Sequence, residues 1–304
     1  MHWFLMSLIA PFLWSLLNHA DKYLISKYSK EVGIGGLVVY SSLFAIFIAP
    51  IAFFLSDTSV FDLFGSEKFF LAIAGAMYSI AILFYLYALE KEDASYVVPF
   101  WLLAPVFGFL LGIIFLGETI EPLKVVGAVV VLLGAVILSI EFEQKKKIKS
   151  IAVILMLASA LTIALSDIIY KKFAEHVDFW PSVFWNQVGM VGFGLICLIF
   201  VANYRKAFIG SIKEGGKEIA TLNVAGETIQ SIAIVANNYA LMLAPVALVL
   251  LATYTFQPLF VFIEGILLTI FFPKISSENI SKKHLIQKGV SILIMALGVY
   301  LVLM

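Results

Sequence analysis

The chain carries two carboxylates, Glu227 and Glu264, inside long apolar stretches. Glu227 lies about nine residues into its stretch, or roughly 14 Å along a helix, which is close to the middle of a bilayer. An ionised carboxylate at that depth is costly, so such a group usually faces a polar pathway. The alternative is a neutral carboxyl group hydrogen-bonded between helices. We expect Glu227 to bind a substrate or a proton, and Glu264 either to share in coupling or to reach the membrane interface.

Further polar residues share the faces of these helices. Gln230 and Asn238 follow Glu227 on one helical stripe, and Gln257 shares a stripe with Glu264. The predicted substrate-binding residues are Glu227, Gln230, Asn238, Asn18, Trp14, Tyr78 and Gln257, and the predicted coupling residues are Glu227 and Glu264. Polar residues at such spacing can also serve helix packing, so both interpretations stay open.

Two prolines, Pro105 and Pro258, lie inside apolar stretches. A proline removes a backbone hydrogen bond and bends a helix, which leaves carbonyl groups free near the membrane centre. Such broken helices commonly form the solute site of a carrier, although a proline can also merely shape the packing.

The charges of the deep residues predict the class of ligand. All 20 Lys and Arg residues fall in loops or in the first or last turn of an apolar stretch. A cavity that contains carboxylates and no basic group favours cationic, zwitterionic or neutral molecules and disfavours anions. Burial also favours the neutral form of a carboxyl group, so Glu227 could exchange a proton for a substrate.

The sequence offers no support for an enzyme, a cofactor or a metal site. The four histidines, His2, His19, His176 and His284, lie at termini, stretch ends or loops, without metal-ligand spacing. Cys197 is the only cysteine. The net charge is zero and the basic residues form no aromatic-interleaved patch, which argues against nucleic-acid binding.

The elements that must position these residues are membrane-spanning helices. Apolar residues make up 62% of the chain and charged residues 13%, so we expect an all-α polytopic membrane protein in contact with lipid. The expected spans are 3–20, 32–55, 69–89, 95–116, 123–140, 150–171, 181–202, 218–243, 245–270 and 285–303. The polar stretches 56–68 and 203–217 are expected to be loops.

The chain repeats itself at half its length. Residues 78–89 and 230–241 are identical at seven of twelve positions, at an offset of 152 in 304 residues. Three further residues, Ala94, Pro105 and Gly112, are matched at an offset of 153 by Ala247, Pro258 and Gly265. Five spans per half is an odd number, so the halves, 1–146 and 147–304, should be inverted repeats around a central cavity. Such repeats are typical of secondary transporters.

The loops that follow the odd-numbered spans, together with Lys288 in the first turn of 285–303, carry 16 of the 20 Lys and Arg residues. By the positive-inside rule these loops face the cytoplasm, which places both termini outside. We expect a multi-pass protein of a prokaryotic inner membrane, because 19 lysines against one arginine are typical of an AT-rich prokaryotic genome.

The chain resembles the EamA family of the drug/metabolite transporter superfamily. The likeness rests on the ten spans in two repeats, the Tyr-Ala-Leu ends of 69–89 and 218–243, the two prolines, and the run LGETIEPLKVVGAVVVLLGAVIL at 116–138. In the first repeat, Gly117-Glu118 ends the span 95–116 as in the family pattern. Two features depart from that pattern: the second repeat has Phe271-Phe272-Pro273 at this place, and the charge count opposes the termini-inside arrangement that the family implies.

The resemblance implies a basket of helices that works by alternating access, often for efflux of amino acids, drugs or other metabolites. The expected function is proton-coupled efflux of a small organic solute. An importer of inverted topology, or a sensor or assembly protein on the same fold, remains the alternative. Substrate identity, direction, coupling ion, orientation and oligomeric state are not determined by the sequence.

Overall fold

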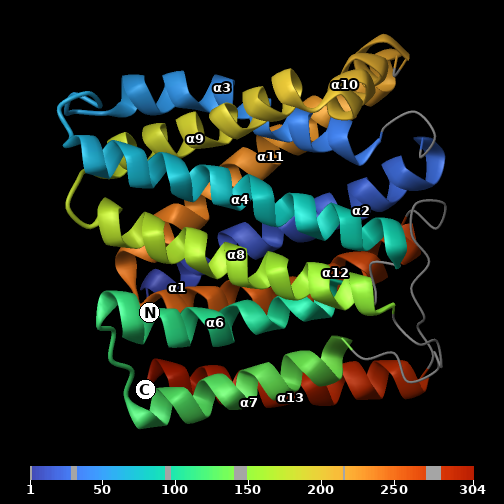
Figure 1. Cartoon of the computed structure of the whole chain (residues 1–304). Coiled ribbons are helices and arrows are strands. Elements are labelled where there is room, and N and C mark those ends of the chain that lie inside the picture. Colours follow the sequence, from blue (N-terminus) through green and yellow to red (C-terminus); the bar gives the residue numbers. More distant parts are fainter. Residues whose placement is uncertain (1, 29–32, 93–96, 140–148, 215, 272–281) are drawn as a thin grey trace.

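The computed structural model describes residues 2–28, 33–92, 97–139, 149–214, 216–271 and 282–304. Its helices lie side by side in one bundle (Figure 1). The first half contains α1 (His2–Ser7), α2 (Ile9–Tyr28), α3 (Ile34–Leu55), α4 (Gly65–Lys91), η1 (Val98–Leu103), α6 (Ala104–Leu111), η2 (Gly112–Leu116) and α7 (Pro122–Ser139). The second half contains α8 (Ser150–Ala174), α9 (Phe179–Phe200), α10 (Ala202–Glu214), α11 (Gly216–Leu243), α12 (Val246–Phe271) and α13 (Lys282–Leu303).

The helices follow from the apolar sequence, because a lipid-exposed backbone must satisfy its hydrogen bonds within the segment. Local signals set several ends. Glu67 Oε2 accepts a hydrogen bond of 3.0 Å from the Phe64 N–H and so caps the start of α4. Gly117, with φ of 64°, ends the π-helix η2 in the left-handed conformation.

Within the described residues, seven segments are long and apolar enough to cross a membrane. They are Ile34–Leu55, Gly65–Lys91, Pro99–Leu116, Ser150–Ala174, Phe179–Phe200, Val246–Phe271 and Leu285–Leu303. Two shorter apolar helices occupy His2–Asn18 and Pro122–Leu138. The chain is therefore an all-helical multi-pass membrane protein over its described part, whereas the expected total of ten spans stays a prediction.

Two features differ from the expected pattern. The polar stretch 203–217 was expected to be a loop, but α10 occupies Ala202–Glu214. Its apolar residues recur at helical spacing between charged ones, so it forms an amphipathic helix that a search for long apolar runs overlooks. The segment around Pro105 is also less regular than one kinked helix. Its 3₁₀ helix η1 precedes α6, and Pro105 is the second residue of α6, where the missing N–H costs little.

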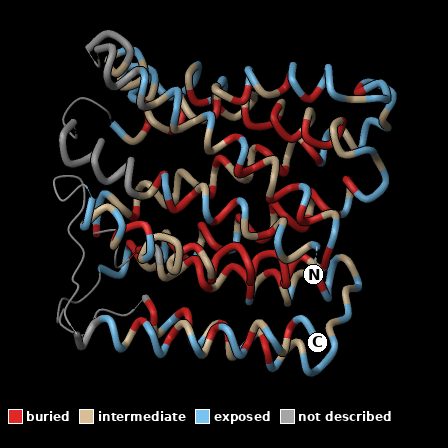
Figure 2. The backbone as a smooth tube through the Cα atoms, turned by 180° about the vertical axis from the view of Figure 1, so that it is seen from behind, coloured by how far each residue is buried: buried red, intermediate tan, exposed pale blue. Residues whose placement is uncertain are grey.

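Helices at corresponding places of the two halves pack in pairs: α3 with α9, α6 with α12, and α7 with α13. Phe53 contacts Phe184, and a Cβ on Gly194 would meet Ser42, so α3 and α9 run antiparallel. Buried residues concentrate in the inner helices, as Figure 2 shows. Both termini lie at one end of the bundle (Figure 1).

Helices α4 and α9 approach so closely that their contact depends on glycine. A Cβ on Gly75 would lie 1.9 Å from Asn186 O, and a Cβ on Gly189 would lie 1.8 Å from Ala72 O. No side chain fits at such a distance, so the two backbones touch through these glycines. This contact fixes α4, and with it Tyr78, against the second half of the chain.

Candidate functional site

A hydrogen bond joins the two halves of the chain in the interior of the bundle. Gln230 Nε2 of α11 donates to Tyr78 OH of α4 over 2.7 Å. Tyr78 lies about 13 residues, or roughly 20 Å, from either end of α4, and thus at mid-depth. The structure therefore brings together two of the residues that the sequence predicts for substrate binding.

Asp167 of α8 lies beside this pair and was missed in the sequence analysis. Its side chain is 5% exposed and is hydrogen-bonded to Asn237 of α11. It is close enough to Tyr78 and Tyr254 to interact with them electrostatically. Among the described residues, its Oδ2 atom is buried without a hydrogen-bond partner. Asp167 precedes Lys171 by one turn, so in the sequence it resembles a polar helix end, whereas α8 continues to Ala174.

Further amide and hydroxyl groups lie next to Asn237. Thr253 Oγ1 of α12 donates to Asn237 Oδ1 over 3.3 Å. Asn238 is directed to α9, where its Nδ2 donates to Asn186 Oδ1 over 3.5 Å, the longest distance at which a hydrogen bond is meaningful. Asn238 thus lies near the site but bonds to a different helix from Asn237.

An aromatic cluster adjoins the polar residues. We define it as Trp14, Tyr85, Trp101 and Tyr254, contributed by α2, α4, η1 and α12. The ring centroids lie 6.3 Å apart for Trp14 and Tyr254, 6.0 Å for Trp101 and Tyr254, and 4.3 Å for Tyr85 and Trp101. Trp101 Nε1 donates to Ser159 Oγ of α8 over 3.2 Å, which fixes the indole against that helix.

The two carboxylates singled out in the sequence each accept a hydrogen bond from a serine. Ser41 Oγ of α3 donates to Glu227 Oε2 over 2.9 Å, and Ser15 Oγ of α2 donates to Glu264 Oε1 over 2.7 Å. Glu227 is half-buried, and Glu264 is 8% exposed. Glu264 is therefore held between α12 and α2 in the interior of the bundle.

The remaining predicted residues lie in the same helices. Gln257 is buried in α12, and Asn18 is half-buried in α2. Pro258 follows Gln257 inside α12, so it weakens the helix directly beside a buried amide.

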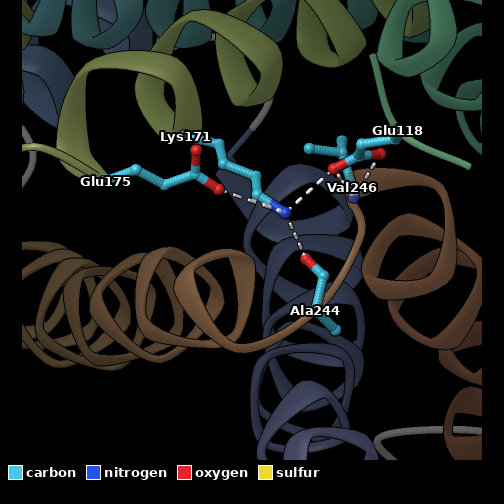
Figure 3. A network of polar contacts seen from close by, with 5 residues as sticks. All are labelled: Glu118, Lys171, Glu175, Ala244 and Val246. Atoms are coloured by element: carbon cyan, nitrogen blue, oxygen red, sulfur yellow. Dashed lines mark hydrogen bonds and ion pairs between the residues drawn. The ribbon is translucent and has the colours of Figure 1, made fainter. Parts of the chain in front are cut away.

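An ion-pair cluster, drawn in Figure 3, lies at the end of the bundle that carries the termini. Lys171 Nζ is 2.8 Å from Glu118 Oε1 and donates to Ala244 O over 2.7 Å. The Val246 N–H donates to both Glu118 oxygens, over 3.0 and 3.1 Å. Glu175 adds a longer contact of 3.6 Å to Lys171. Glu118 thus caps α12 while it pairs with Lys171.

The sequence did not indicate that Lys171 and Glu118 form an ion pair. Lys171 lies in the last turn of α8, as expected, yet it is buried. Glu118 was noted only as part of a family pattern. Among the described residues, no group of three His, Cys, Asp or Glu side chains could hold a metal ion.

The comparisons with known proteins agree with this architecture. The sequence model of the EamA-like transporter family, which is part of the drug/metabolite transporter superfamily, matches residues 1–140 and confirms the resemblance found in the sequence. A solved structure titled only "Crystal structure of protein" matches with a TM-score of 0.69 over 99% of this chain and 97% of its own, at 17% identity. That likeness concerns the fold alone. No curated protein matches. The family and the apolar helices together define a multi-pass membrane protein with a transporter-type fold.

Proposed function

We propose that the protein is a secondary active transporter that moves a small organic solute by alternating access. The observation that carries this proposal is the group of polar side chains that Tyr78, Gln230, Asp167 and Asn237 form in the interior of an apolar bundle. Polar and ionisable residues inside a membrane protein are costly and usually mark the path of a solute or ion.

The proposal includes inverted repeats, 1–146 and 147–304, on either side of this site. The pairs α3–α9, which is antiparallel, α6–α12 and α7–α13 support it, because corresponding helices of inverted halves meet each other across a two-fold axis. Relative movement of the halves would then expose the site to each side of the membrane in turn.

The charges support a cationic, zwitterionic or neutral substrate, such as an amino acid or a drug. Asp167, Glu227 and Glu264 are acidic, and Lys171, one turn from Asp167, is paired with Glu118. An anionic solute at this site would be repelled by these carboxylates, since the nearby Lys171 already pairs with Glu118. We place Glu227 on the proton path and propose efflux from a prokaryotic cell across the inner membrane, with the basic loops inside.

Flux into proteoliposomes tests the function directly. Purified protein is reconstituted into lipid vesicles. Each batch of vesicles is loaded with one solute, chosen from the cationic, zwitterionic, neutral or anionic class, and exchange against the labelled external solute is measured. Exchange of a cation or zwitterion above the rate of empty vesicles supports the proposal. Absence of exchange for every class would point instead to a non-transporting sensor or assembly protein on the same fold.

A further inference from the structure

The carboxylate of Asp167 lacks the partners that a buried charge requires. It is 5% exposed, Asn237 supplies a hydrogen bond, and Oδ2 has no hydrogen-bond partner within the described part of the chain. A buried carboxylate is stable only when it is paired, hydrogen-bonded or neutral. The nearest lysine in sequence, Lys171, has its ammonium group bound by Glu118 and the Ala244 carbonyl. An external cation would complete the site.

The surroundings of Asp167 favour an organic cation. Tyr78 and Tyr254 interact electrostatically with the carboxylate, and Tyr254 packs against both Trp14 and Trp101. Aromatic faces attract ammonium groups, most strongly where water is excluded. The same rings provide an apolar surface for the hydrocarbon part of a ligand.

Glu227 and Glu264 are less suited to this task. Each accepts a hydrogen bond from a serine, and Glu227 is only half-buried. Asp167 lies beside Tyr254, which is a member of the aromatic cluster. It therefore combines a buried oxygen atom without a hydrogen-bond partner among the described residues with two neighbouring tyrosine rings.

We propose that Asp167 binds the ammonium group of an organic amine and that the aromatic cluster receives the rest of the ligand. The inference rests on the proposed transport function, and it assigns both the charge of the substrate and the residue that recognises it. The site draws on α2, α4, η1, α8, α11 and α12, so the bound amine would contact both halves of the chain.

The first test compares three probes that share one hydrocarbon skeleton: phenethylammonium, 2-phenylethanol and phenylacetate. Isothermal titration calorimetry of the full chain in detergent should give an affinity for the ammonium about 10- to 100-fold above that for the alcohol, and no binding of phenylacetate. Asp167→Asn should abolish this preference. Asp62→Asn makes the same change on an exposed loop and should keep the affinity within about twofold of wild type.

A second pair of variants guards against loss of folding. Tyr254→Leu removes a ring of the aromatic cluster and should bind phenethylammonium about 3- to 30-fold more weakly than wild type, whereas Tyr300→Leu, at a position that is 61% exposed, should bind it within about twofold of wild type. Gel filtration and thermal unfolding establish that each variant is folded before titration. A folded Asp167→Asn protein that retains the preference for the ammonium would overturn the inference.

Other results also contradict it. The inference is wrong if wild type binds the ammonium and the alcohol equally, binds phenylacetate alone, or does not bind the ammonium. It is also wrong if Na⁺ stabilises the wild type but not Asp167→Asn, and amines stabilise neither. The two proposals can fail separately. If proteoliposomes exchange a solute and Asp167→Asn does not change the affinity for that solute, the amine site is wrong but the transport function stands. If the protein binds the ammonium but exchanges no solute, the amine site stands but the transport function is wrong.

Discussion

Tyr78 and Gln230 are hydrogen-bonded to each other although they occupy equivalent positions in the two halves, 152 residues apart. Trp101 and Tyr254, equivalent at the offset of 153, also lie in contact, with ring centroids 6.0 Å apart. In the proposed inverted repeat, a residue can touch its own counterpart only close to the two-fold axis that would relate the halves. Both contacts therefore support an axis that passes through the candidate site.

Replacement of Tyr78 by phenylalanine should destabilise the protein by about 0.5–2 kcal/mol, because it leaves the Gln230 amide without its acceptor in an apolar interior. Unfolding in mixed micelles, followed by circular dichroism, measures the effect. Tyr300→Phe removes the same hydroxyl from a side chain that is 61% exposed and should change stability very little. Equal effects of the two changes would mean that the hydrogen bond does not stabilise the fold.

Lys171→Met should cost about 3 kcal/mol or more, because it leaves Glu118 as a buried carboxylate without its cation. Lys172→Met is the matched control, since the neighbouring Lys172 is exposed. The double variant Lys171→Met with Glu118→Gln should recover part of the loss, which a thermal melt of the three proteins would detect. If the lysine variants were equally stable, the ion-pair cluster would contribute nothing measurable.

Gly189→Ala should destabilise the α4–α9 contact by at least about 1–3 kcal/mol, because the new methyl group would overlap the Ala72 carbonyl. Gly192→Ala, on the same helix with open space around the position, should be neutral or slightly stabilising. The yield of folded protein and its melting temperature report both effects. A tolerated Gly189→Ala would show that α4 and α9 can separate without cost.

Glu227→Gln should make solute flux insensitive to a pH gradient if Glu227 carries the proton. Flux in proteoliposomes with and without an imposed gradient measures this, and Glu90→Gln, an exposed change of the same kind, should behave as wild type. A Glu227→Gln protein that still responds to the gradient would exclude the coupling role.

The charge distribution makes an independent prediction about orientation. With the basic loops inside, a reporter fused after Met304 should be active only if it functions outside the cytoplasm. Activity of a cytoplasmic reporter at the same position would reverse the arrangement.

Hydropathy predicted the described helices closely, because a long apolar run in lipid has few alternatives to a helix. It could not predict α10, whose apolar residues are too few for a span. It also could not predict the 3₁₀ helix η1 and the π-helix η2, which precede and follow α6. For the site, the sequence does not show which helices pack against each other. A stripe of polar residues indicates which face of a helix is polar, but it does not indicate which helix that face will meet.

Two contacts illustrate this limit. Glu264 is bonded to Ser15, 249 residues away, and no local pattern connects them. Asp167 was missed because nearby lysines make its stretch look like a helix end, whereas the fold encloses it with Tyr78 and Tyr254. Tyr78 and Gln230 were both expected in the site, yet their mutual hydrogen bond required the structure.

The ion-pair cluster also distinguishes the two ends of the molecule energetically. In the repeat, the position equivalent to Glu118 is Phe271, which is 68% exposed and cannot form such a pair. Two identical halves would give inward-open and outward-open states of equal free energy, but here the Glu118–Lys171 pair has no counterpart at the equivalent position of the second half. In a protein that alternates as proposed, the two states would then differ in free energy, and the resting population would be unequal.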